Sequence, residues 1–156
     1  NSFPDDEKWP NISIVIRQFS NDLDVANEFR AFVKNGKVTA LSQYQQELCM
    51  PEIVNNHDKI SKKVQDFFYN QLVNAIPQNF IQGCVLDLAL IKDDVVVIEI
   101  NPFCERTGPA LFKWSEDHDV LYGIKPFEFR YLKEPIDHME LRLAPWYELL
   151  KKAGIK

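Results

Sequence analysis

Residues 80–103 constrain the fold of this chain more than any other stretch. They hold two runs rich in Val, Leu and Ile, separated by the polar residues 92–94. Aliphatic and β-branched runs on both sides of a short polar turn are typical of a β-hairpin. We expect a three-residue loop that pairs Ile91 with Val95, and this loop sets the register of the whole hairpin.

In that register Asp87 faces Glu99 across the hairpin. Side chains alternate between the faces of a strand, so Asn101 shares the face of Glu99. Like charges directly opposite one another destabilise an antiparallel pair. Two carboxylates and an amide oxygen are hard ligands of the kind that Mg²⁺ accepts, usually together with phosphate oxygens. We therefore predict that Asp87, Glu99 and Asn101 bind Mg²⁺. Removing either carboxylate is expected to leave the metal-free protein equally stable or more stable.

The hairpin has a second interpretation. A loop that differs by one residue makes Asp87 and Glu99 diagonal neighbours instead of opposite ones. Both acids then lie on a solvated face with no ion bound.

The composition is that of one folded domain. The chain has 156 residues, of which 46% are hydrophobic and 12% aromatic, which is enough for a core. Its net charge of -5 argues against a broad contact with nucleic acid or an anionic membrane. Cys49, Cys84 and Cys104 form no zinc motif, and we expect all three to be reduced. Without an apolar leader or a membrane-spanning run, the expected location is the cytoplasm.

The N-terminal part combines a polar segment with strand patterns. Residues 1–11 contain two prolines and are interpreted as a flexible entry or linker, while residues 12–156 form the domain. Residues 12–19 are a short β-branched run. Asn35-Gly36 lies between the runs of residues 28–34 and 37–42, and Asn-Gly in this setting is a strong signal for a tight hairpin.

The middle of the chain predicts a helix. From Asp58 to Ile76 apolar residues recur at helical spacing, and Pro77 is expected to end the helix. Residues 44–56 contain Pro51 and are interpreted as a loop. A last short helix is expected over residues 146–152.

The order strand, hairpin, helix, hairpin indicates an α+β fold with a largely antiparallel sheet and helix packed on one face. No glycine-rich phosphate loop is present in the sequence. Arg17 and Arg30 lie within strand patterns, and a guanidinium group binds phosphate or carboxylate oxygens through paired hydrogen bonds. Both arginines are therefore candidates for holding a nucleotide's phosphates. The alternative is an exposed strand face or a structural pair, such as Arg30 with Glu28.

Several short motifs occur in an order and at a spacing known from one protein family. They are Ile14-Val15-Ile16-Arg17, Glu28-Phe29-Arg30, Leu41-Ser42-Gln43, Gln65-Asp66-Phe67-Phe68, Asn101-Pro102-Phe103 and Leu111-Phe112-Lys113-Trp114. Over residues 12–116 the chain resembles the cell division cycle protein 123 family, whose members have an ATP-grasp fold.

This resemblance implies the C-terminal lobe of an ATP-grasp domain, with ATP and Mg²⁺ bound between two lobes and the N-terminal lobe absent from the chain. Asp87, Glu99 and Asn101 match the family's metal positions, and Arg30 matches an arginine near the phosphates. Residues 14–17 match the strand that leads through the adenine-binding hinge. Glu99 departs from the family's usual aspartate and gives the Glu-x-Asn pattern of ATP-grasp ligases.

Three functions stay open. The resemblance implies an ATP-binding assembly protein, or chaperone, for translation initiation factor 2, with a subunit of that factor as partner. The alternative is an ATP-grasp carboxylate-amine ligase that works through an acylphosphate, which Glu99 favours. The third is a degenerate grasp domain that binds no nucleotide.

Overall fold

The structure is a computed structural model, and it describes Ile14, Ile16, Gln18, residues 20–136, Glu148, Leu149, Lys151 and Lys152. The segment 1–11 lies outside the described residues. Most of the predicted strand over residues 12–19 does so too, and Ile14 and Ile16 within it are exposed and belong to no strand. Of the last predicted helix, four residues from Glu148 to Lys152 are described, and all four are helical.

The described elements form an α+β fold, as predicted. In chain order they are the 3-10 turn η1 (Val25–Asn27), β1 (Glu28–Lys34), β2 (Lys37–Gln43), α1 (Pro51–Asn70), the 3-10 turn η2 (Leu72–Asn74), α2 (Gln78–Gln82), β3 (Gly83–Ile91), β4 (Asp94–Pro102), α3 (His118–Leu121) and β5 (Glu128–Arg130). The strands form one sheet in the order β4-β3-β1-β2-β5. All neighbouring strands are antiparallel except β2 and β5.

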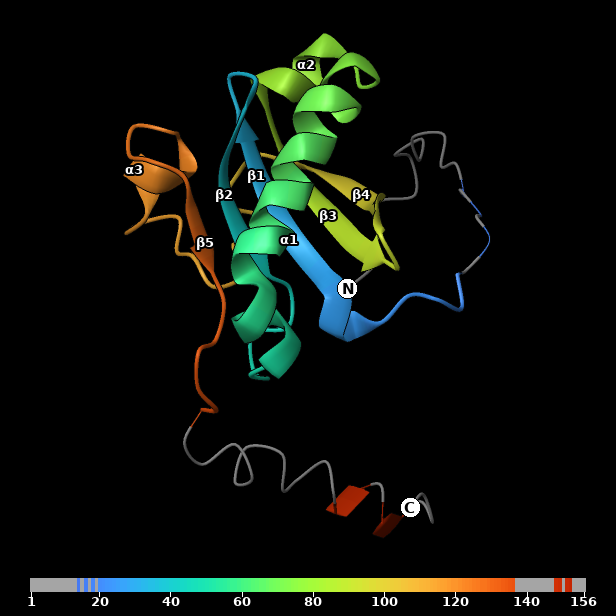
Figure 1. Cartoon of the computed structure of the whole chain (residues 1–156). Helices are drawn as coiled ribbons and strands as arrows, with labels where there is room; N and C mark the ends of the chain where they lie inside the picture. Colours follow the sequence, from blue (N-terminus) through green and yellow to red (C-terminus); the bar gives the residue numbers. More distant parts are fainter. Residues whose placement is uncertain are drawn as a thin grey trace, which may run out of the picture.

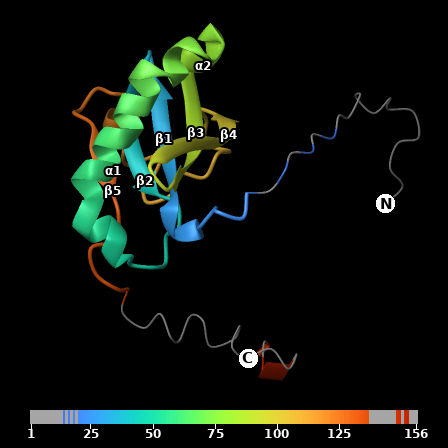
Figure 2. The same ribbon diagram turned by 45° about the vertical axis from the view of Figure 1, so that its right-hand side comes forward.

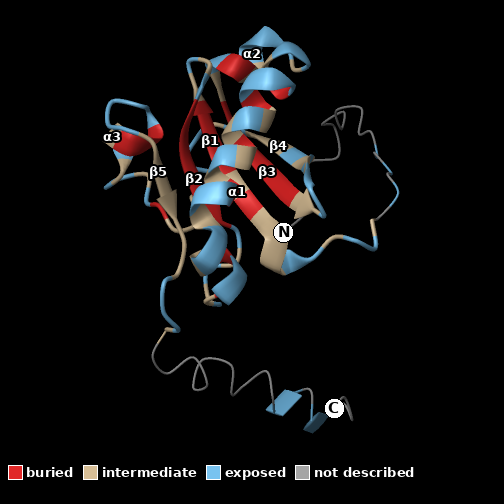
Figure 3. Ribbon diagram, in the orientation of Figure 1, coloured by how far each residue is buried: buried red, intermediate tan, exposed pale blue. Residues whose placement is uncertain are grey.

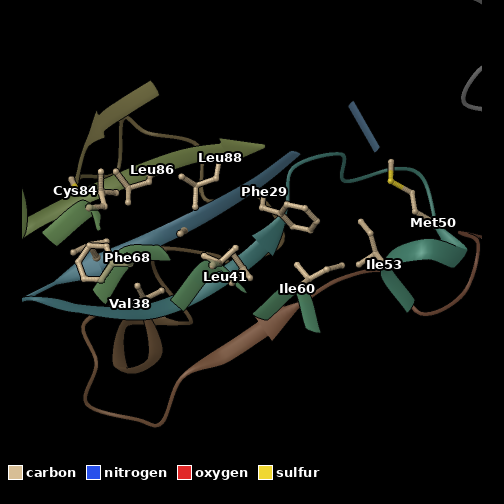
Figure 4. Close-up of a cluster of buried hydrophobic side chains, with 14 residues drawn as sticks. Phe29, Val38, Leu41, Met50, Ile53, Ile60, Phe68, Cys84, Leu86 and Leu88 are labelled. Carbon is tan, nitrogen blue, oxygen red and sulfur yellow. The ribbon is translucent and has the colours of Figure 1, made fainter. Parts of the chain in front are cut away.

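Each face of the sheet carries an apolar layer. Figures 1 and 2 show α1 running along one face, where it buries Ile53, Ile60, Val64 and Phe68. These side chains pack on inward-facing residues of β1, β2 and β3, and Figure 4 shows this cluster. A second cluster, which includes Phe32, Val85 and Phe112, lies on the opposite face beneath the chain between β4 and β5. Buried residues therefore concentrate on the central strands (Figure 3).

The helix differs from its predicted limits at both ends. It begins at Pro51 instead of Asp58, because proline is well suited to the first turn, where its missing N–H group has no helical partner. It ends at Asn70, before the η2 turn, whereas the prediction extended it to Ile76. Pro77 instead precedes α2. The predicted loop over residues 44–56 is therefore wrong from Pro51 onward.

The first hairpin is confirmed. Asn35 and Gly36 both have positive φ angles, 50° and 74°, as a two-residue turn of this kind requires. In the described part of the chain, no helix has the length and apolar character to span a bilayer.

The second hairpin reaches the predicted register by another route. Its turn has two residues, because Ile91 pairs with Asp94, so the predicted three-residue loop is wrong. This turn alone would place Asp87 opposite Ile98. A β-bulge between Asp87 and Leu88 shifts the register by one residue and brings Asp87 opposite Glu99.

Candidate functional site

A row of polar residues crosses the sheet at one level. Arg30 on β1 pairs with Asp87 on β3, and Asp87 pairs with Glu99 on β4. On the other side of β1, Ser42 of β2 pairs with Arg30. Phe29 and Ala31 belong to the cluster under α1, so alternation directs Arg30 and the rest of this polar row to the opposite face.

Arg30 and Asp87 form a two-point ion pair at the centre of the polar row. Arg30 Nε donates to Asp87 Oδ1 and Nη2 donates to Oδ2, each at 2.8 Å. Only 11% of the Arg30 side chain and 6% of the Asp87 side chain are exposed. The hydrogen bond with Asp87 is the largest cause that raises the pKa of Arg30 above its ordinary value. Arg30 therefore neutralises Asp87 directly.

This pair changes the electrostatic interpretation of the hairpin. The predicted repulsion between Asp87 and Glu99 assumed two carboxylates with no positive charge beside them. Arg30 lies on the other side of Asp87, 57 positions away in sequence, and supplies that charge. The alternative pair of Arg30 with Glu28 is wrong, because the described contacts of the guanidinium go to Asp87, Gly108 and Tyr44.

Asn101 joins the two carboxylates. Its side-chain nitrogen donates to Asp87 Oδ2 at 3.0 Å and to Glu99 Oε2 at 3.5 Å. The three predicted metal ligands therefore converge, with Asp87 buried and Glu99 exposed. Among the described residues no group of three His, Cys, Asp or Glu side chains is arranged to hold a metal ion. A cation here would bind two carboxylates and would complete its shell with the Asn101 amide oxygen and non-protein oxygens, which suits Mg²⁺.

The polar row opens into a hollow of about 740 Å³. Its lining residues are Arg30, Asn101, Pro102, Cys104, Glu105, Arg106, Thr107 and Gly108. The loop after β4 forms most of the wall, and two hydrogen bonds fix it. Thr107 Oγ1 donates to the Pro102 carbonyl at 2.6 Å, and Trp114 Nε1 donates to the Thr107 carbonyl at 2.7 Å.

Arg30 is also held from the side of this wall. Its Nη1 donates to the Gly108 carbonyl oxygen, and its guanidinium carbon lies 5.0 Å from the centre of the Tyr44 ring. A Cβ atom at Gly108 would lie 3.3 Å from Arg30 Nη1, so the approach is close. No motif in the sequence pointed to Tyr44, Arg106 or Gly108 as site residues. The available signal was the position of residues 104–108 directly after the Asn101-Pro102-Phe103 motif.

Arg17, the second predicted phosphate ligand, lies outside the described residues.

Comparison with known proteins decides the family. The family model described as D123 matches residues 2–147, which is nearly the whole chain. The chain belongs to the D123 family. Its predicted resemblance to the cell division cycle protein 123 family is thereby confirmed.

Relatives of this D123-family chain include proteins with two kinds of name. The cell division cycle protein 123 of Candida glabrata is 34% identical over 116 residues, which cover 69% of this chain and 29% of that protein. The translation initiation factor eIF2 assembly protein of Vanderwaltozyma polyspora is 27% identical over 188 residues, which cover 97% of this chain and 49% of that protein. The D123-family chain thus spans about half or less of the length of these relatives.

Solved structures confirm the fold. C-terminally truncated Cdc123 from Schizosaccharomyces pombe matches with a TM-score of 0.57 and 29% sequence identity. The match covers 69% of the D123-family chain and 40% of the other chain. The mixed α+β architecture is therefore shared with a solved member of the family.

Proposed function

We propose that this D123-family chain supplies one side of an ATP-Mg²⁺ site and acts in the assembly of translation initiation factor 2. The observation that supports this most is the convergence of Arg30, Asp87, Glu99 and Asn101 beside a hollow large enough to hold phosphates.

The proposed roles follow from the chemistry of the side chains. Asp87, Glu99 and Asn101 would hold Mg²⁺, which bridges to phosphate oxygens when bound. Arg30, and Arg17 on the strand pattern upstream, would bind the phosphates directly. Arg30, Asp87 and Glu99 together carry one positive and two negative charges. A divalent cation reverses the sign of this net charge, which then favours the binding of a polyphosphate.

The ATP-grasp architecture is part of the proposal. In such a fold a nucleotide lies between two lobes, and the five-stranded sheet would be the C-terminal lobe. The polar row lies on the face opposite α1, where a second lobe could cover the hollow. A nucleotide enclosed between two lobes would be shielded from water. The lower dielectric constant there would strengthen the contacts of its phosphates with Arg30.

The names of the relatives support the cellular role. Proteins from Vanderwaltozyma polyspora and Xenopus laevis are both named translation initiation factor eIF2 assembly protein. We infer that the protein carrying this chain binds a subunit of that factor, and that bound ATP organises the binding surface without being consumed.

Calorimetry with the complete natural protein tests the nucleotide site. We expect ATP to bind in the presence of Mg²⁺ and to lose this affinity in EDTA. Glu99→Gln should abolish the Mg²⁺ dependence, and its exposed side chain makes a folding defect unexpected. Glu105→Gln is the matched control, because Glu105 lines the same hollow but lies outside the polar row. Absence of Mg²⁺-dependent ATP binding would contradict the proposal.

Two further measurements test the cellular role and the ligase alternative. The tagged protein should recover subunits of translation initiation factor 2 from cells, and Glu99→Gln should weaken this recovery. ADP release that depends on an added carboxylic acid and amine would instead support a carboxylate-amine ligase.

A further inference from the structure

We propose that Arg30 is an internal counter-cation for Asp87. When Mg²⁺ and the nucleotide bind, Asp87 must exchange its Arg30 partner for the metal ion. As a result, the cation and the phosphates of the nucleotide bind cooperatively. This inference rests on the proposed ATP-Mg²⁺ site and assigns a linkage between its two ligands.

The first observation is that both Asp87 oxygens are already engaged. Oδ1 accepts from Arg30 Nε, and Oδ2 accepts from both Arg30 Nη2 and Asn101 Nδ2. A carboxylate has about four acceptor positions. A cation that binds Asp87 must therefore approach beside a positive guanidinium or displace it. Since Asp87 is buried, solvent screens this repulsion poorly.

The second observation is that Arg30 has an anchor of its own at the wall of the hollow. Its Nη1 donates to the Gly108 carbonyl, and Tyr44 lies beside the guanidinium group. When Asp87 binds the metal ion instead, Nε and Nη2 of Arg30 lose their hydrogen-bond partners. The guanidinium group stays beside the hollow because Nη1 still donates to the Gly108 carbonyl. The two freed donors form the fork that binds phosphate oxygens.

Cooperativity follows from the burial of the pair. A metal ion that takes Asp87 leaves Arg30 as an unpaired buried charge, and a phosphate that takes Arg30 leaves Asp87 unpaired. Breaking a buried ion pair on one side is strongly unfavourable. When both ligands bind, each charge has a new partner. Each ligand therefore raises the affinity of the other, by the same factor.

The first test measures the cation alone. Mn²⁺ replaces Mg²⁺ as a probe with oxygen ligands, and its binding without nucleotide is followed by electron paramagnetic resonance or by the rise in melting temperature. We expect Arg30→Gln to bind Mn²⁺ about fivefold or more tightly than wild type. The melting readout remains valid if the variant is less stable, because it compares each protein with and without Mn²⁺.

Arg106→Gln is the matched control for the loss of positive charge. Arg106 lines the same hollow and forms no ion pair with the described residues. We expect a much smaller gain in Mn²⁺ affinity than for Arg30→Gln. Equal gains would show that Arg30 acts only through its charge, and would overturn the exchange.

The second test is reciprocal and measures ATP in EDTA, without a divalent cation. Asp87→Asn releases Arg30, so we expect it to bind ATP about fivefold or more tightly than wild type under this condition. Glu99→Gln removes the same charge without touching Arg30 and should gain less. Equal ATP affinities for these two variants would refute the exchange.

The outcomes separate this inference from the proposed function. If wild type binds ATP with Mg²⁺ but the Arg30 and Asp87 variants gain nothing over their controls, the exchange is wrong and the nucleotide site stands. If wild type binds no ATP with Mg²⁺, the proposed function fails, and the exchange fails with it.

Discussion

Arg30 and Asp87 face each other on neighbouring strands and share two hydrogen bonds of 2.8 Å, although 57 positions separate them in sequence. Asp87 also lies opposite Glu99, so the buried carboxylate has a positive charge on one side and a negative charge on the other. This relationship decides how each residue contributes to stability.

Asp87→Ala should destabilise the metal-free protein by about 3 kcal/mol, because it leaves Arg30 as a buried charge without its partner. Glu99→Ala should change the free energy of unfolding by less than about 0.5 kcal/mol, because Glu99 is exposed. Urea unfolding in EDTA measures both. The expectation from sequence, that either substitution leaves stability equal or higher, is therefore corrected for Asp87. Equal effects of the two substitutions would disprove the role given to the ion pair.

Arg30→Ala should weaken binding of ATP and of ADP in the presence of Mg²⁺ by about tenfold or more, because a charge-assisted hydrogen bond contributes about 1.5–3 kcal/mol. Adenosine has no phosphate, so its affinity should stay at the wild-type value. Calorimetry with the three ligands makes the comparison. A similar loss for adenosine would mean that the substitution damages the site as a whole.

Asp117 should make the protein sensitive to acid. Arg130 donates to its two oxygens at 2.8 and 2.6 Å, and this hydrogen bonding is the largest cause that lowers the pKa of Asp117 below its ordinary value. The unfolded chain therefore binds the proton more readily, so stability is present above the ordinary carboxyl pKa and is lost as pH falls through it toward the lowered value.

The test compares melting temperatures between pH 7 and pH 3. Asp117→Asn should flatten the acid branch of the curve, and Arg130→Gln should flatten it to a similar extent. Because both substitutions remove the Asp117–Arg130 pair, the double variant should flatten the acid branch no further than either single one. Additive effects would show that Asp117 and Arg130 act independently.

Gly123→Ala should destabilise the fold by about 2 kcal/mol or more. Gly123 has a φ angle of 74°, and an added Cβ would lie 2.9 Å from Cγ2 of the buried Thr39. Gly36→Ala is the matched control, since Gly36 has the same φ angle but its Cβ would meet Ile81 at an ordinary 3.6 Å. We expect about 1 kcal/mol there, from the backbone alone. Chemical unfolding of both variants checks the difference.

Local patterns in the sequence were enough to predict both hairpins and the long helix, but not α2, α3 or β5. Asn35-Gly36 predicts a tight turn because few residue pairs adopt two positive φ angles without strain. The apolar spacing from Ile60 to Phe68 predicts a buried helix face. The start of the helix was predicted wrongly, because Pro51 is as compatible with a loop as with a first helical turn.

The register of the second hairpin was predicted correctly for a reason that proved wrong. The pairing of Asp87 with Glu99 depends on a two-residue turn and on the bulge that follows. A turn is a local property, whereas no pattern in the sequence indicated the bulge. The resemblance to the family indicated Asp87, Glu99 and Asn101 as metal ligands independently of this geometry.

The sequence by itself determined the strands of the two hairpins and the buried face of the long helix, because side-chain alternation and helical periodicity act within a few residues. Only the tertiary structure decided that β1 lies beside β3. That pairing places Arg30 against Asp87, and the loop after β4 adds Gly108 and Arg106 to the hollow. Contacts between residues far apart in sequence depend on the packing of both sheet faces, and no local pattern encodes them.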